Sequence, residues 1–261
     1  MEQLDVKGLV LRVTDIGDYD RLLTVLTETE GRLLVTGKGV KSIKSPHMPT
    51  TQPFCYSHFI LKKTHKYFYI ADSEVIDCFF GLRYDLDRLA LASYLCDVAG
   101  DFSVEGIADS DLLRLTLNTL YALSNKETPL WQIKAAYEFR VSADEGYKPD
   151  LVGCALCHRY TADKMYLDVM NGRLLCPECR YQAEKTADVE EDDGTAKIYL
   201  PLTPAVLEAM RYVLYAPLSR YLSFTLDESE RPLFSASCEK YLLHHLEHGF
   251  ESLSYYKSIL E

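Results

Sequence analysis

Carboxylates are missing from one long window of a chain that is otherwise rich in them. The 261 residues include 39 Asp and Glu, yet none of these lies between residues 31 and 71. The window carries a formal charge of +7, while the other 21 basic and 39 acidic residues leave −18. Charge that only kept a protein in solution would be mixed in sign, so the window predicts a surface for a polyanion. Its basic residues, the candidate nucleic-acid contacts, are Arg32, Lys38, Lys41, Lys44, Lys62, Lys63 and Lys66.

Features of membrane and secreted proteins are also missing. No stretch approaches ~20 uninterrupted apolar residues, the length that crosses a bilayer. The opening residues Met1-Glu2-Gln3-Leu4-Asp5 contain two acids and no apolar run, unlike a secretory signal. With 48% hydrophobic and 26% charged residues, the composition is that of an ordinary globular protein. We expect a cytoplasmic protein with no membrane partner.

Catalytic motifs are the third absence. The chain has no P-loop and no G-x-G-x-x-G pattern, and Gly37-Lys38-Gly39 is too short to cradle a phosphate by itself. Three histidines, His47, His58 and His65, fall in the acid-free window without a Ser-His-Asp order or paired carboxylates. We expect these histidines to be structural or to contact phosphate. The sequence predicts no catalytic residue and no enzyme.

Four of the eight cysteines form two close pairs. They read C-x2-C-x18-C-x2-C, a spacing typical of a structural zinc site, in which two knuckles complete one tetrahedron. A c-type haem attachment, suggested by the C-x-x-C-H ending at His158, needs export and leaves the second pair unexplained. A thioredoxin-like redox pair explains only one of the two. The prediction is one structural Zn²⁺ bound by Cys154, Cys157, Cys176 and Cys179.

The other four cysteines are isolated in apolar surroundings. Disulfides seldom persist in a reducing cytosol, where a buried cysteine behaves as a small hydrophobic residue. We therefore expect buried thiols at Cys55, Cys78, Cys96 and Cys238.

The apolar pattern changes along the chain from strands to helices. Up to about residue 78, short Val-, Leu- and Thr-rich runs alternate with Gly, Asp and Pro signals, which indicates a small antiparallel barrel or sandwich. The segment that follows Gly37 contains Pro46 and Pro49, which disfavour a helix or a central strand, so we expect an extended basic loop there. From residue 82 the period lengthens to that of helices, with Thr203-Pro204 as one helix start. Strands followed by helices predict an α+β protein.

Aromatic residues accompany the lysines of the acid-free window. Tyr56, Phe59, Tyr67 and Tyr69 are candidate platforms on which bases of a single strand stack. In a strand, Tyr67 and Tyr69 point to one face, and the intervening Phe68 points to the other. The sequence leaves open which of the two faces belongs to the core.

Several of these segments resemble the bacterial recombination mediator family RecO. The resemblance is carried by residues 8–27, by Glu30-Gly31-Arg32, by Gly37-Lys38-Gly39-Val40-Lys41-Ser42 and by Gln52-Pro53-Phe54. The helical part and the four-cysteine insertion are similar to the zinc-bearing branch of this family. The likeness extends over nearly the whole chain.

This resemblance implies a fold and a function. Residues 1–79 would form a five-stranded OB-fold barrel, and residues 80–261 an all-α domain with a zinc finger inserted at about 150–182. The protein would bind single- and double-stranded DNA, anneal complementary strands and help to load the RecA recombinase. Its partners would be RecR and the acidic C-terminal tail of single-stranded-DNA-binding protein, in a nucleoid-associated location. The DNA contacts would include Arg32, Lys38, Lys41 and Lys44, and a weak partner site would involve Lys134 and Arg140.

Rival functions stay open at this point. An OB-plus-zinc module acting on structured RNA would recognise the 2′-hydroxyl. A protein–protein scaffold would use the basic window for an acidic partner. A zinc hydrolase is disfavoured, because four sulfur ligands leave no open position on the metal.

Overall fold

The computed structural model describes residues 3–64, 67–125, 127–187 and 198–260. The chain divides into two compact units, one formed by Met1–Leu130 with Phe250–Glu261 and the other by Trp131–Gly249. Each unit has its own buried core.

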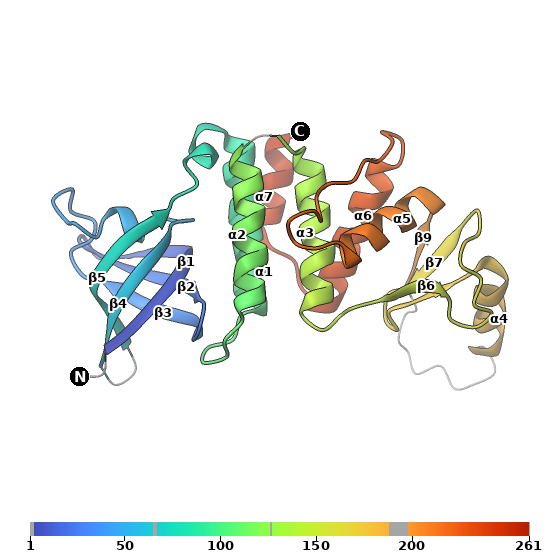
Figure 1. The fold of residues 1–261 in the computed structure, drawn as a ribbon, viewed down its shortest axis with the longest axis horizontal. Coiled ribbons are helices and arrows are strands. Elements are labelled where there is room, and N and C mark those ends of the chain that lie inside the picture. The colour runs from blue at the N-terminus through green and yellow to red at the C-terminus, as the bar shows by residue number, and fades with distance from the viewer. Residues whose placement is uncertain (1–2, 65–66, 126, 188–197, 261) are drawn as a thin grey trace. The chain divides into compact units, whose positions relative to one another are not determined.

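The first unit begins with a closed barrel of five strands in the order β1-β2-β3-β5-β4, drawn from blue to teal in Figure 1. Neighbouring strands are antiparallel except β3 and β5. These two run parallel, with Val35 opposite Phe68 and Thr36 opposite Tyr69. The prediction of a small barrel is confirmed, and its topology is that of an OB-like fold. The strands are β1 (Gln3–Ile16), β2 (Asp20–Thr27), β3 (Gly31–Gly37), β4 (Tyr56–Thr64) and β5 (Tyr67–Asp77).

Side chains that alternate along each strand fill the barrel. Successive residues of a strand point to opposite faces, so one set is buried and the other faces outward. The outward set determines what the barrel can bind. The buried set is Val6, Val10, Leu23, Val25, Leu33, Val35, Phe59, Leu61 and Phe68.

The segment between β3 and β4 differs from the extended loop that was expected. It consists of consecutive turns followed by the 3-10 helix η1 (Pro49–Thr51). Val40 is buried, and the amide of Lys41 donates to the carbonyl of Tyr19 in the β1–β2 turn. Gly39, with φ at +66°, allows the turn that a residue with a side chain would resist. An apolar anchor thus folds the basic loop back onto the barrel.

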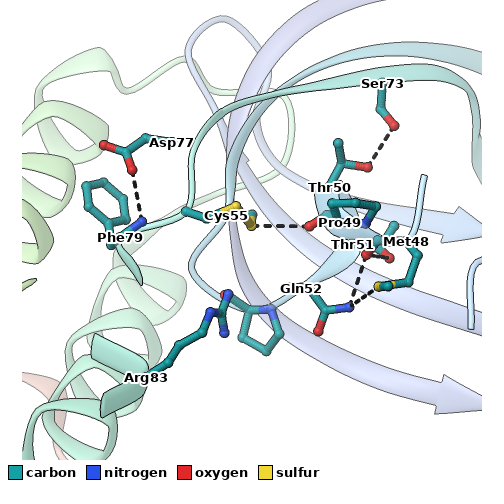
Figure 2. Close-up of a disulfide and its surroundings, with 12 residues drawn as sticks. Met48, Pro49, Thr50, Thr51, Gln52, Cys55, Ser73, Asp77, Phe79 and Arg83 are labelled. Atoms are coloured by element: carbon teal, nitrogen blue, oxygen red, sulfur yellow. Dashed lines mark hydrogen bonds between the residues drawn. A yellow bond between two sulfur atoms is a disulfide. The ribbon is translucent and has the colours of Figure 1, made fainter. Parts of the chain in front are cut away.

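Cys55 and Cys78 form a disulfide, shown in Figure 2, so the expectation of free thiols is wrong for these two. The reason lies in the register of β4 and β5, where Tyr56 is opposite Asp77. The residues just outside that pair, Cys55 and Cys78, are therefore brought together. The remaining isolated cysteines, Cys96 and Cys238, are buried free thiols as expected.

Helices complete the first unit. The side chain of Asp85 caps α1, and Asp109 accepts from the amide of Leu112 at the start of α2. In α1, Asp97 accepts a hydrogen bond from the hydroxyl of Ser252 in α7. The helix α7 was not anticipated from the sequence. The elements are η2 (Phe80–Tyr84), α1 (Leu86–Phe102), α2 (Ser110–Asn125) and α7 (Glu251–Leu260).

The second unit combines helices with a small four-stranded sheet of order β6-β8-β7-β9. Thr203 caps α5 through the amide of Val206, with Pro204 at the first helical position, as predicted. The polar helix α4 was not anticipated, because no apolar stripe marks it. The elements are α3 (Leu130–Asp144), β6 (Asp150–Cys154), β7 (Met165–Asp168), β8 (Arg173–Leu175), α4 (Pro177–Ala187), β9 (Tyr199–Leu202), α5 (Pro204–Tyr215) and α6 (Arg231–Leu246).

The chain is thus an α+β protein, as its sequence predicts. A search of the described residues finds no helix with the length and apolar character needed to span a bilayer. The expected functional boundary between residues 79 and 80 stays a prediction.

Candidate nucleic-acid interface and metal centre

The paired cysteines come together in the second unit. The sulfur atoms of Cys154, Cys157, Cys176 and Cys179 all lie within 4.8 Å of one another, and those of Cys157 and Cys176 are 3.7 Å apart. A tetrahedral ion with metal–sulfur bonds of ~2.3 Å requires sulfur atoms about 3.8 Å apart. The four cysteines therefore fit one metal ion.

The backbone places the two knuckles side by side. β6 and β8 pair in parallel, with Cys154 opposite Leu174, and Cys176 follows β8 directly. The first knuckle is closed by the amide of His158, which donates to the carbonyl of Cys154 at 2.8 Å. His158 has a φ of +60°, so it serves as the turn residue of this knuckle.

The four thiols differ in acidity. Burial raises the pKa of Cys154, but backbone hydrogen bonds from Cys157, Cys176 and Leu156 outweigh it and lower this pKa to about 6. Burial raises the pKa of Cys179. Among these four cysteines, Cys157 is exposed and the other three are buried.

The predicted nucleic-acid contacts lie on the barrel of the first unit. Residues opposite one another in neighbouring strands share a face of the sheet. Tyr69 lies between Thr36 of β3 and Lys62 of β4, so these three side chains form one outward row. The ammonium group of Lys38 lies over the Tyr69 ring, 4.8 Å from its centroid. Lys38 and Lys62 are therefore both next to the Tyr69 ring.

The structure also settles which face of β5 is outside. Phe68 belongs to the barrel core, whereas Tyr67 is 59% exposed. Leu34, on the adjacent strand β3, is 51% exposed. One earlier candidate platform, Phe59, does not reach this surface because it is fully buried. Tyr56 is partly buried and lies at the other end of β4 from Lys62, opposite Asp77. We call the outward set the tyrosine face; it contains no carboxylate and consists of Leu34, Thr36, Lys38, Lys62, Tyr67 and Tyr69.

Lys41 lies in a different environment, next to carboxylates that precede the acid-free window. Its ammonium group is 3.1 Å from the carboxylate of Asp15 in β1, which also accepts from Arg21 at 3.2 Å. The hydrogen bond from Lys41 contributes most to lowering the pKa of Asp15. Folding thus returns acids to part of the basic window, which the linear charge count could not show.

The remaining predicted contacts are scattered. Lys44 is exposed on the loop after β3, and Lys63 lies with its ammonium group 5.7 Å from the centroid of Phe68. The guanidinium of Arg32 donates at 2.7 Å to the carbonyl of Gly100 near the end of α1. Lys66 lies outside the described residues. For all of these, a role in binding stays a prediction.

The histidines of the window have local partners. The ring of His47 is 2.8 Å from the hydroxyl of Ser73, and His58 is hydrogen-bonded to Asp5. His65 lies outside the described residues. The two described histidines tie strands and loop together, in agreement with a structural role.

The two residues of the weak partner site are engaged within the second unit. Lys134 is buried and lies 2.7 Å from both Glu138 and Glu239. Burial lowers its pKa, but the two carboxylates outweigh this, so the pKa is raised above its ordinary value. Arg140 donates to Asp144 and to two backbone carbonyls. An acidic partner would have to compete with these internal contacts, and the partner site stays a prediction.

A pocket in the first unit was not anticipated from the sequence. Its volume is about 440 Å³, and its polar lining includes Arg12, Arg83 and Asp97. Arg12 pairs with Asp97 at 2.7 Å. Arg83, labelled in Figure 2, donates to the carbonyl of Pro53. Strands and helix come together only on folding, so no local pattern could have revealed it.

Comparisons with known proteins agree with this architecture. Residues 1–79 match the family described as "Recombination protein O N terminal", and residues 83–254 match "Recombination protein O C terminal". Among curated relatives, "DNA repair protein RecO" of Acetivibrio thermocellus is 29% identical over 99% of this chain and 98% of its own length. The protein of the same name from Desulforudis audaxviator is 28% identical over the same shares.

A third relative, "DNA repair protein RecO" of Dehalococcoides mccartyi strain CBDB1, is 30% identical over 79% of this chain and 76% of its own length. The two matched regions follow one another along the chain and together cover the barrel and most of the residues after it. The chain belongs to the RecO family of recombination proteins.

Proposed function

We propose that this protein is a non-enzymatic recombination mediator in DNA repair, which binds single- and double-stranded DNA and anneals complementary strands. The observation that carries the proposal is the carboxylate-free tyrosine face of the barrel, where Lys38 and Lys62 flank Tyr69. Lysines that neutralise phosphates release counterions, which supplies affinity without regard to sequence.

The mechanism follows from charge and needs no covalent step. Two DNA strands repel each other, and a surface that neutralises phosphates on both lowers the barrier to their encounter. Pairing between the bases then completes annealing. In this proposal Lys41, Lys44, Lys63, Lys66 and Arg32 extend the same phosphate contacts beyond the tyrosine face.

The second part of the proposal is a structural Zn²⁺ on the four cysteines, as in the zinc-bearing branch of the family. Four sulfur ligands close the coordination sphere, so the ion would hold the two knuckles together. Residues 1–79 would act as the DNA-binding part and 80–261 as the helical part that carries the finger at about 150–182.

The partners that we propose are RecR and the acidic tail of single-stranded-DNA-binding protein. Through them the protein would assist loading of the RecA recombinase in the cytoplasm, at the nucleoid. Lys134 and Arg140 remain the proposed, weak contacts for the tail.

A salt titration of DNA binding tests the function. The variant with Lys38, Lys44 and Lys62 changed to Gln is expected to bind single- and double-stranded DNA more weakly at every salt concentration. Its plot of log affinity against log salt for single strands should be shallower by about 2, since each lost phosphate contact removes about 0.7. Filter binding measures both quantities, and the metal content should stay that of the parent protein.

The matched control removes three exposed lysines elsewhere, Lys7, Lys164 and Lys240, also by change to Gln. It has the same net charge as the test variant, so unchanged affinity separates a local surface from overall charge. Equal loss in both variants would contradict the proposal. Affinity that requires the 2′-hydroxyl of RNA would favour the RNA-binding alternative instead.

A further inference from the structure

Two exposed apolar side chains lie beside each other on the tyrosine face. Tyr67 is 59% exposed on β5, and Leu34 is 51% exposed on the adjacent strand β3. The core side of β5 is already filled by Phe68, so the Tyr67 ring is not a displaced core residue. These side chains form an apolar surface between lysines.

Tyr67 and Tyr69 both lie on a paired strand, β5. β5 is hydrogen-bonded to β4 on one side and to β3 on the other, with Thr64 opposite Tyr67 and Thr36 opposite Tyr69. A side chain with few rotatable bonds on a paired strand loses little conformational entropy when it binds. The surface is therefore preorganised.

The spacing of the two rings suits an unpaired strand. Residues two apart in a strand are separated by ~6.8 Å, whereas stacked bases in a duplex strand are about 3.4 Å apart. Neighbouring bases must therefore unstack to contact both rings. The bases of a duplex are stacked and paired, so their ring faces are not accessible to this surface.

The position of Lys38 makes the surroundings of the two tyrosine rings different. Its ammonium group lies over Tyr69, while Tyr67 has no cation over its ring among the described contacts. A lysine over an aromatic ring can meet a phosphate, and the exposed Tyr67 ring next to it can meet the attached base.

From these observations we infer that Tyr67, supported by Leu34 and Tyr69, is a stacking site for the unpaired bases of single-stranded nucleic acid. This inference rests on the proposed function and adds to it the part of the ligand that is recognised. The lysines bind phosphate on any DNA, and the Tyr67 ring adds affinity for single strands alone.

The test compares Tyr67→Ser with wild type on three probes, a single-stranded oligonucleotide, a duplex, and a single strand of abasic sites. Base stacking on an aromatic side chain predicts a loss of about 5- to 150-fold for the ordinary single strand. Duplex affinity should be unchanged. The wild-type protein should bind the abasic strand as weakly as Tyr67→Ser binds the ordinary one, and the variant should not distinguish these two strands.

Salt dependence separates this site from the lysines. Loss of an apolar contact releases no counterion, so Tyr67→Ser should keep the wild-type slope while its affinity falls. Tyr67→Phe keeps the ring and should bind like the wild type. The matched control is Tyr121→Ser on α2, a tyrosine with 60% exposure that should leave every affinity unchanged.

The outcomes distinguish the inference from the proposed function. Equal affinity of wild type and Tyr67→Ser for single strands, or equal wild-type affinity for the ordinary and abasic strands, overturns the stacking site while the lysine effects stand. Loss in Tyr67→Phe as well would point to the hydroxyl group and also overturn it. Absence of any DNA binding by the wild-type protein would remove the proposed function itself.

Discussion

The barrel and the cysteine-bearing region differ in how their candidate sites relate to the fold. The tyrosine face consists of side chains that are not needed to fill the barrel core, so its members are partly or largely exposed and replaceable. The four cysteines are largely buried and bring two knuckles close enough to share one metal ion. The tyrosine face is not needed for the barrel to fold, whereas the four-cysteine site is expected to contribute to the folding of its region. Substitutions in the tyrosine face should therefore weaken DNA binding and leave the stability of the fold unchanged. Substitutions of the four cysteines should lower the stability of the fold itself.

Metal removal should have the largest effect on this contrast. Structural zinc contributes about 10–16 kcal/mol of apparent binding free energy in small zinc-finger peptides, so chelation is expected to unfold the four-cysteine region. Cys176→Ser should act in the same direction. Metal analysis together with thermal unfolding measures the change. The comparison is the variant with Lys38, Lys44 and Lys62 changed to Gln, which should keep the stability of the parent protein. An equal loss of stability in this variant would contradict the difference between the two sites.

Lys134→Met should come next, because it removes this cation from the buried Glu138 and the partly buried Glu239. Removing one partner of a buried ion pair costs about 3–5 kcal/mol. The matched control is Arg114→Met, whose pair with Asp111 is exposed and contributes about 0–1 kcal/mol. Denaturant unfolding compares them, and similar costs for both would show that the burial of Lys134 has no energetic weight.

Reduction of the Cys55–Cys78 disulfide should destabilise the barrel by about 3 kcal/mol, through the added freedom of the unfolded chain. Thermal unfolding with and without dithiothreitol measures it. The double variant Cys55→Ala, Cys78→Ala is the control, since its unfolding should not respond to the reductant. A reductant effect of the same size in that variant would place the sensitivity elsewhere.

The smallest effects should be equal in the two compact units that contain these regions. Asp109→Ala removes the cap of α2, and Thr203→Ala removes the cap of α5. Each is expected to cost about 1 kcal/mol, because one amide at each helix start loses its acceptor. Denaturant midpoints measure both. A cost confined to one variant would mean that local helix energetics also differ between the regions.

Sequence reasoning succeeded where residues close in the chain act together. The four clustered cysteines lie within 26 residues, and the Thr203-Pro204 cap is local. It failed where distant segments meet. Cys55 and Cys78 bond because β4 and β5 pair in one particular register, and Asp15 reaches Lys41 because a loop folds back onto the β1–β2 turn.

The helices α4 and α7 show a second kind of limit. Glu178 and Lys185 belong to a polar helix that has no apolar stripe, so the helical period is absent from its pattern. In α7, Leu253 and Tyr256 are buried in the first unit, although a long stretch of chain separates them from its other residues. Periodicity alone cannot identify such helices, since packing against distant partners stabilises them.

The sequence by itself determined the α+β class, the four-cysteine cluster and the basic character of one window, because these depend on composition and short spacings. Only the tertiary structure decided that Lys41 pairs with Asp15 and which tyrosine of β5 is the more exposed. The physical reason is that strand pairing sets neighbours across the barrel. Tyr69 meets Lys62 through the β4–β5 register, and Lys38 reaches the same ring from the next loop.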